Sequence, residues 1–180
     1  SWGYEKNYKS LFDSVITANF SIHPANLNSK TIKEIVMKGE QQLDQDLQQI
    51  LDQTPLSPKE REKMEKVILQ SHCGYQAQEM VEPMIRVQRI RDVAMTASLL
   101  NSKADIKVLI AGSGHVRSDH GVPMYLHQAE KNAKVISIAL YEVNEHFSEI
   151  NDYAKRWEDG IFPFGYVWFT AVAEREDPCI

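Results

Sequence analysis

The chain has 180 residues, a formal net charge of -5, 43% hydrophobic residues and 25% charged residues, which are ordinary values for one globular domain. The acidic balance and the lack of a basic tract exclude a typical nucleic-acid-binding protein, so no nucleic-acid partner is expected. No apolar run reaches the roughly 20 residues that a transmembrane helix needs. The two cysteines, Cys73 and Cys179, have no metal-ligand spacing, and the sequence does not say whether they form a disulfide.

Helical patterns fill the chain up to residue 101. Apolar residues recur at helical spacing over 4–18, and further helices are predicted over 31–38, 40–53, 57–71 and 78–101. The helix over 57–71 has a clear start, because Ser57 and Glu60 form a capping box and Pro58 suits the first helical position.

The helix over 78–101 is the longest of the predicted helices, and its broad Met-rich face indicates core packing. Gln88, Arg91 and Asp92 are polar residues beside that apolar face. Partly buried polar groups need hydrogen-bond partners. We therefore regard these three side chains as candidates for holding a functional site together.

The pattern changes after residue 105. The apolar run 106–111 is typical of a buried strand, a helix is expected over 123–131 and a second strand over 135–140. Such a strand–helix–strand unit normally forms a parallel pair through a right-handed crossover. Residues 142–163 are predicted to be irregular, and 166–170 to form a last strand. The whole pattern predicts an α/β fold, with a mostly parallel sheet flanked by helices and a helical segment in the first half.

The loop between residues 112 and 121 concentrates polar side chains at one point of the chain. Gly112 and Gly114 allow a tight turn, and four groups of chemical use follow: His115, Arg117, Asp119 and His120. Because ligands of open α/β sheets bind at the carboxyl ends of strands, we expect a site here, with His115 at that edge of the sheet. The alternative is a plain strand-to-helix turn that these polar residues solvate. A dinucleotide site is rejected, because the third glycine of its fingerprint is absent.

Several blocks of the sequence resemble the ChaN-like haem-binding lipoprotein family of bacteria. Residues 112–126 are similar to the family signature G-x-G-H-x-R…G-V-P-x-x-L, and 88–95 to its Q-R-x-R-D-x-x-M block. His72-Cys73, the W-F-T…D-P-C ending over 168–179, and Trp2, Tyr8 and Asn26-Leu27 fit further blocks in the same order. The family's early G-E-x-H element is absent. We therefore expect residues 1–180 to form a single ChaN-like domain that represents the later two-thirds of a longer domain.

The resemblance implies a function as well as a fold. It implies an α/β protein that handles haem in bacterial iron uptake, anchored to the outer membrane or facing the periplasm through an N-terminal lipid that this chain does not contain. It also suggests a homodimer with haem near the subunit interface, a tyrosine on the iron and an outer-membrane haem receptor as a further partner.

Three tyrosines lie in or beside the family blocks. Haem iron accepts His, Cys, Met or Tyr as a protein ligand, and a phenolate suits ferric iron. Tyr75 is the preferred candidate, because it follows Gly74 at a predicted helix end and should be exposed; Tyr8 and Tyr125 are the others. For each of them, packing in a half-buried position is the competing interpretation.

Two histidines and one arginine complete the candidate set. His115 is expected to ligate iron or to hydrogen-bond a haem propionate. His72 is either a ligand or a cap at its helix end. Arg117 can pair with a propionate, because a guanidinium matches the geometry of a carboxylate, or it can be a solvated charge of the loop.

The sequence leaves more than one class of function open. The first is haem binding without catalysis. The second is a hydrolase, with or without a metal, because the family resembles erythromycin esterases and some metalloproteases; His115 would then be a general base or metal ligand. The missing G-E-x-H element weakens this second interpretation, since a base needs a partner carboxylate. A purely structural or interaction module is the third.

Overall fold

A computed structural model describes residues 4–39, 43–71, 78–155, 157 and 160–173. Its helices are α1 (Tyr4–Asn7), α2 (Lys9–Thr17), α3 (Ser29–Lys38), α4 (Gln45–Gln53), α5 (Pro58–Ser71), α6 (Gln78–Asn101), α7 (Val122–Ala129) and α8 (Ile150–Ala154). Its strands are β1 (Ile138–Glu142) and β2 (Tyr166–Thr170). None of the described helices is both long enough and apolar enough to cross a membrane.

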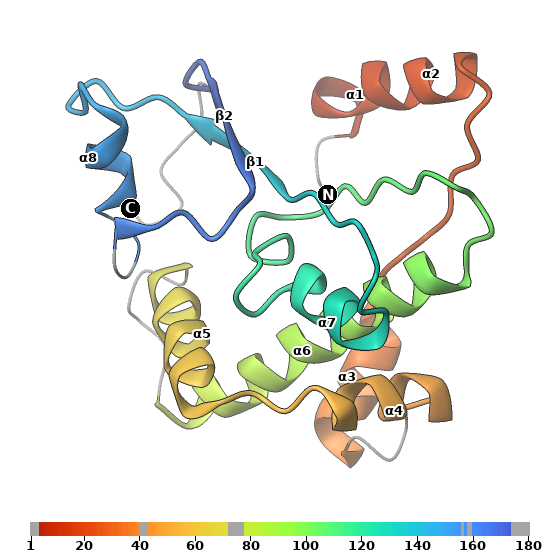
Figure 1. The fold of residues 1–180 in the computed structure, drawn as a ribbon. Coiled ribbons are helices and arrows are strands. Elements are labelled where there is room, and N and C mark those ends of the chain that lie inside the picture. The colour runs from red at the N-terminus through yellow and green to blue at the C-terminus, as the bar shows by residue number, and fades with distance from the viewer. Residues whose placement is uncertain (1–3, 40–42, 72–77, 156, 158–159, 174–180) are drawn as a thin grey trace.

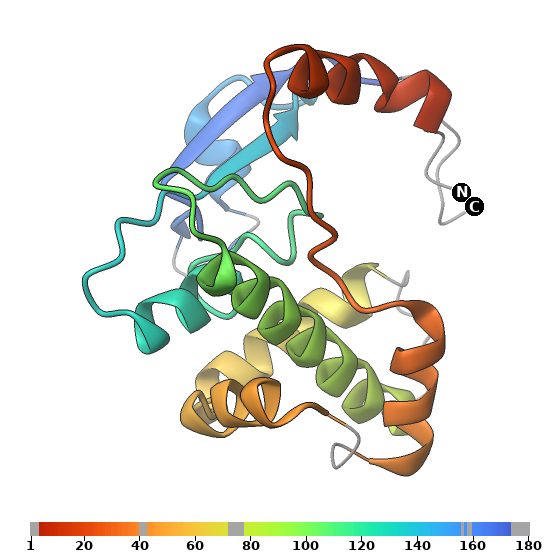
Figure 2. The same cartoon turned by 90° about the vertical axis from the view of Figure 1, so that its right-hand side faces the viewer.

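The long helix α6 is the centre of the fold. Helices α3, α4, α5 and α7 all contact it and surround it in space (Figures 1 and 2). Within the described ranges, three clusters of buried apolar side chains join α6 to these neighbours. The buried members are Val81 and Ile85 with Met64 and Ile68 of α5, Ile90 with Ile32 and Ile35 of α3, and Val93 with Leu51 of α4 and Tyr125 of α7.

One arginine of α6 forms hydrogen bonds with both α4 and α7. Arg89 Nε donates to the Tyr125 hydroxyl at 3.2 Å. Arg89 Nη2 donates to the backbone carbonyls of Leu51 at 3.2 Å and Thr54 at 2.8 Å, at the end of α4. Carbonyl groups at a helix end have no partner within the helix. The guanidinium therefore satisfies groups at the end of α4 and fixes α4 and α7 against the same side of α6.

The sheet of the described structure is a parallel pair. Strand β1 lies beside β2 with Ile138 opposite Tyr166. One face is covered by an aromatic cluster around Tyr153 of α8, whose ring lies 6.0 Å from that of Tyr141 and 4.8 Å from that of Phe169. The other face exposes apolar side chains: Ile138, Leu140, Tyr166 and Trp168.

The predicted α/β class with parallel strands is confirmed, but the predicted strand over 106–111 is wrong. No residue in this segment is in a strand, and Ile106, Val108 and Ile110 are exposed. A short apolar run becomes a strand only where a neighbour takes up its backbone hydrogen bonds. No described strand pairs with this segment, so the expected strand–helix–strand unit over 106–140 does not form and β1 pairs with β2 instead.

The helices agree more closely with expectation. The capping box at the start of α5 is confirmed, with Ser57 N–H donating to a Glu60 carboxylate oxygen at 2.7 Å and Glu60 N–H to Ser57 Oγ at 3.3 Å. The predicted helix over 4–18 is divided at Tyr8 into α1 and α2, and α2 buries none of its side chains. Figures 1 and 2 show these two helices apart from the body formed by α3 to α7.

Packing around α6 makes a direct prediction. Ile90 is 1% exposed, so Ile90→Ala removes its contacts with α3 and leaves a cavity. We expect the free energy of unfolding to fall by about 2–5 kcal/mol, measured by urea denaturation. Ile16→Ala is the control, because that side chain is 63% exposed on α2. Equal losses in the two variants would contradict the central role of α6.

Candidate functional site

The 112–121 loop folds back on itself through its own backbone. His115 N–H donates to the Gly112 carbonyl at 2.9 Å, and Val122 N–H donates to the His115 carbonyl at 2.8 Å. Gly121 lies so close to this turn that a Cβ atom on it would be 2.5 Å from the His115 carbonyl oxygen and 2.7 Å from that of Arg117. Such contacts are well inside van der Waals distance, so only glycine fits at this point. The sequence thereby fixes where the His115 side chain leaves the loop.

The same loop is tied to the sheet region. Ser118 donates to the Pro163 carbonyl from both its N–H at 2.8 Å and its hydroxyl at 3.0 Å. Ser137, next to β1, donates from its hydroxyl to the Val116 carbonyl, and its own carbonyl accepts from Tyr166 N–H at 2.9 Å. The loop is thus held between α6 on one side and the strand region on the other.

His115 meets two polar residues of α6. Its Nδ1 lies 2.6 Å from Asp92 Oδ1 and 2.9 Å from the Gln88 side-chain nitrogen. Gln88 and Asp92 are four residues apart, so they lie on the same side of α6 one turn from each other. The polar residues that the sequence showed beside the apolar face therefore find their partner in the loop.

Burial determines the chemistry of Asp92. The residue is 0% exposed, and this burial raises the pKa of its carboxyl from 3.8 to about 7, although His115 opposes the shift. Its second oxygen, Oδ2, has no hydrogen-bond partner among the described residues. A buried carboxylate with one free oxygen is costly. The His115 ring is thus the group that stabilises its ionised form.

The Asp92 contact selects one form of the histidine ring. When Asp92 is ionised, Nδ1–H of His115 donates to it in a charge-assisted bond, which is the strongest kind available to a neutral imidazole. The lone pair then lies on Nε2, and no described residue forms a hydrogen bond with that atom. The His115 side chain is 17% exposed, so Nε2 belongs to a partly accessible group. The arrangement can donate to a metal or accept a proton.

A second polar group lies further along the loop. Arg117 is 4% exposed and donates from Nε and Nη2 to the two Asp119 oxygens at 2.8 and 2.6 Å. The centre of its guanidinium lies 4.8 Å from the Trp157 ring centroid, which is a cation–π contact. Burial alone raises the pKa of Asp119, but the bonds from Arg117 and the charges around it outweigh burial, and the pKa is lowered.

The other predicted site residues have different positions. Tyr125 is fully buried in the core on α7, its hydroxyl accepts from Arg89, and burial raises its pKa to about 12. Tyr8 is half-buried at the junction of α1 and α2. Tyr75 and His72 lie outside the described residues. The structure therefore places His115 and Arg117 on the same loop but against different neighbours, and it places Tyr125 where its hydroxyl already accepts from Arg89.

The expected position of His115 at a strand end needs correction. The segment before it is not a strand, so His115 lies against α6 and not at the carboxyl edge of a parallel sheet. Trp157 was not predicted as a site residue, because nothing in its local sequence marks it. The sequence did indicate that Gln88 and Asp92, four residues apart on a predicted helix, could take part in a site. It did not indicate that His115 is their partner.

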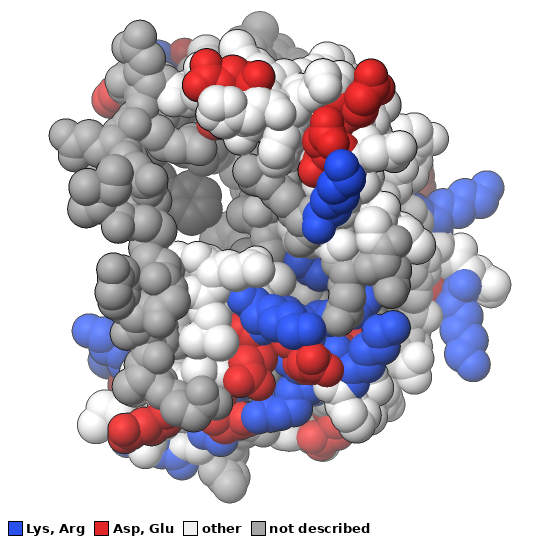
Figure 3. Space-filling view, turned by 90° about the vertical axis from the view of Figure 1, so that its left-hand side faces the viewer, with Lys and Arg blue, Asp and Glu red and all other residues white. Residues whose placement is uncertain are grey.

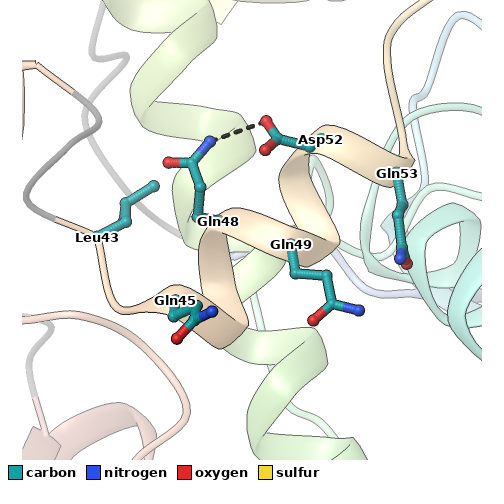
Figure 4. A pocket seen from close by; sticks show the side chains of 6 residues that line it. All are labelled: Leu43, Gln45, Gln48, Gln49, Asp52 and Gln53. Atoms are coloured by element: carbon teal, nitrogen blue, oxygen red, sulfur yellow. Dashed lines mark hydrogen bonds between the residues drawn. The ribbon is translucent and has the colours of Figure 1, made fainter.

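A separate depression over α4 does not compete with this loop. It has a volume of about 550 Å³ and is lined by Leu43, Gln45, Gln48, Gln49, Asp52 and Gln53 (Figure 4). Gln48 donates to Asp52 within it at 2.8 Å. None of these side chains is an ordinary ligand of haem iron. In the parts of the chain that the structure describes, no three His, Cys, Asp or Glu side chains gather in a way that could hold a metal ion.

Comparison with known families places the chain in one of them. Residues 1–126 match the family model described as haem-binding uptake, Tiki superfamily, ChaN. The match spans well over half of the chain and includes both the polar residues of α6 and the 112–121 loop. The chain belongs to this ChaN family of haem-binding uptake proteins. No curated protein and no solved structure matches it.

The buried His120 of this loop should make the stability of the protein depend on pH. His120 is 1% exposed, and burial, followed by the charge of Arg117, lowers its pKa from 6.5 to about 4; Asp119, Lys63 and Glu60 also act on it. The unfolded chain therefore binds a proton at His120 in the window from about pH 6.5 to 4 while the native protein does not. Proton uptake by the unfolded chain lowers the free energy of unfolding. This loss of stability is absent above the window and grows as the pH falls through it.

His120→Gln should reduce the stability lost between pH 7 and about pH 4 by up to about 3 kcal/mol, measured by urea denaturation at both pH values. His127→Gln, an exposed change on α7, is the matched control and should keep the wild-type dependence. An unchanged pH dependence in the His120 variant would contradict a lowered pKa of this histidine in the native protein.

Proposed function

We propose that the chain binds ferric haem beside the 112–121 loop, with His115 as the donor to iron and Tyr75 as the alternative donor. The observation that carries the proposal is the bond between His115 Nδ1 and the buried Asp92 carboxylate. Histidines that ligate metals usually donate their other ring N–H to a carboxylate or carbonyl, which orients the ring and raises its basicity. Haem, when bound, would supply a ferric iron that accepts a histidine nitrogen as a protein ligand.

Each nearby residue has a defined part in this proposal. Asp92 holds the proton of His115 on Nδ1 and so keeps the Nε2 lone pair available. The Gln88 side-chain nitrogen lies 2.9 Å from the same atom but cannot donate to it while Nδ1 carries this proton, so Gln88 only packs beside the ring. Gly121 permits the turn that aims His115 at α6. These residues position His115, and only His115 would touch the iron.

The surface next to the loop also suits a flat apolar ligand. Ile106, Val108 and Ile110 are exposed by 61 to 85% in the segment that leads into Gly112. Clustered exposed apolar side chains commonly mark a binding surface. Arg117 is the candidate partner of a propionate, because its guanidinium matches a carboxylate.

The cellular setting is part of the same proposal. Membership of a haem-binding uptake family supports a role in the cell envelope. We propose that the full-length protein is a bacterial lipoprotein of the outer membrane or periplasm, that it forms a homodimer and that it exchanges haem with an outer-membrane receptor. The family resemblance supports these features, and the haem site does not depend on them.

A hydrolase remains the second candidate, and one observation favours it. Sequence patterns alone identify no partner carboxylate for His115, whereas Asp92 Oδ1 lies 2.6 Å from its Nδ1. A His–Asp pair of this kind holds the imidazole in the form that accepts a proton at Nε2. Hydrolysis of a nitrophenyl ester that is lost in His115→Ala, together with no change in a haem spectrum, would favour the hydrolase.

The haem proposal predicts different effects for ligand and positioning residues. His115→Ala should abolish the Soret shift that accompanies haem titration, and Asp92→Asn should weaken haem binding by about 10–100-fold, because a metal site loses that much when the partner of its histidine is changed. Asp105→Asn, an exposed change, is the control. Thermal unfolding of each variant separates loss of binding from loss of fold.

Tyr75→Phe tests the alternative donor, because it removes the phenol oxygen and keeps the ring. A normal spectrum in this variant together with a lost spectrum in His115→Ala assigns the iron to His115. The opposite result assigns it to Tyr75 and overturns the role of the His115–Asp92 pair. Full-length protein that does not saturate at micromolar haem would contradict the haem proposal itself.

A further inference from the structure

We propose that the pocket lined by α5, the loop around Arg117 and the residues Trp157, Ile161 and Pro163 binds a small oxyanion, a carboxylate or phosphate group, on Arg117 and Trp157. The pocket has a volume of about 120 Å³, and its lining includes Arg117, Trp157, Lys63, Lys66 and Asp119. His115 is not among its lining residues, and anion binding there does not require haem.

The buried guanidinium of Arg117 has one edge without a hydrogen-bond partner. Arg117 is 4% exposed, and Asp119 occupies its Nε and Nη2. Its Nη1 is buried and has no hydrogen-bond partner among the described residues. A buried charged donor without a partner costs more than a neutral one. An oxyanion in the pocket that Arg117 lines would supply the missing acceptor.

The neighbouring Trp157 side chain carries a neutral donor that also lacks an acceptor. Trp157 also lines the pocket, and its indole N–H is buried without a partner among the described residues. The Arg117 guanidinium stacks 4.8 Å from the centroid of the Trp157 ring. This stacking holds the two side chains in a fixed relation. Two side chains that line one pocket thus each carry a buried, unsatisfied donor, and a carboxylate or phosphate offers several acceptor oxygens.

Cationic side chains outnumber carboxylates among the residues that line the pocket. Three cationic side chains, Lys63, Lys66 and Arg117, line it against one carboxylate, Asp119. Asp119 is already engaged by both bonds from Arg117 and lies 3.9 Å from Lys63 Nζ. Figure 3 shows Lys and Arg side chains gathered with Asp and Glu over α5 on this face of the molecule. The lining residues themselves therefore carry more positive than negative charge, which favours an anion, although Lys66 is also paired with Glu62 at 2.9 Å.

Size limits what can enter. A volume of about 120 Å³ corresponds to roughly four water molecules, far below the several hundred Å³ of a pocket for a whole cofactor. The pocket therefore fits a single charged group. That group is a free inorganic or small organic anion, or it is a carboxylate of a larger ligand that lies outside the pocket, such as a propionate of haem. Only the second source rests on the proposed function.

The test follows the Trp157 indole N–H by nitrogen-15 NMR while inorganic phosphate, and separately acetate, is added at constant ionic strength with chloride as the balancing anion. Trp157→Phe identifies the resonance. We expect a saturable shift of Trp157 and no saturable shift of Trp168, which is 68% exposed on β2 and serves as the internal control. Movement of both resonances in proportion to added salt would overturn the proposal and leave ordered water as the partner of the two donors.

Variants decide whether the shift reports this pocket. Arg117→Lys should weaken phosphate binding at least tenfold, because lysine lacks the forked donors. Lys66→Gln should weaken it about threefold, and its side chain is 52% exposed, so the fold is expected to tolerate this change. Lys155→Gln, which removes an exposed charge near α8 outside the pocket lining, is the matched control. A saturable shift that neither pocket variant weakens would also overturn the proposal.

A competition experiment between phosphate and haem distinguishes the two sources of the anion. If the group is a haem propionate, phosphate should raise the apparent dissociation constant of haem and should have no such effect on haem whose propionates are esterified. If the group is a free anion, phosphate and haem should bind independently. Should haem not bind at all, the phosphate titration still decides the inference, so the two proposals fail separately.

Discussion

The interaction on which the account depends is the bond between the buried Asp92 carboxylate and His115. Helix α6 is covered by four other helices, and Asp92 lies within this packed region at 0% exposure. A carboxylate there needs a donor, and the 112–121 loop supplies one through His115 at 2.6 Å. The loop position, the ring orientation and the free Nε2 all follow from satisfying this one buried group.

The same helix therefore carries both the core and the site. Ile85, Ile90 and Val93 pack against α5, α3 and α4, while Gln88 and Asp92 face the loop. Sites built on a rigid helix are held more precisely than sites built from loops alone. His115 comes from a loop, but its ring is oriented by α6, which combines an accessible donor with a fixed direction.

The sequence predicted the parts that local patterns determine. Apolar periodicity and the Ser57–Glu60 capping box identified the helices, and the glycines and polar residues of 112–121 identified the loop. The strand over 106–111 failed because an apolar run does not show whether a neighbouring strand is present to accept its hydrogen bonds. Sequence patterns did not predict the pairing of Asp92 with His115 or of Arg117 with Trp157, because both depend on tertiary contacts between distant segments.

The most direct measurement is the iron–histidine stretching band of the reduced haem complex, recorded by resonance Raman spectroscopy. If His115 ligates iron while donating Nδ1–H to Asp92, the wild-type protein should show this band at the raised frequency of a strongly hydrogen-bonded imidazole, and Asp92→Asn should lower it. A band that Asp92→Asn leaves in place would contradict the account. So would a haem complex with no iron–histidine band.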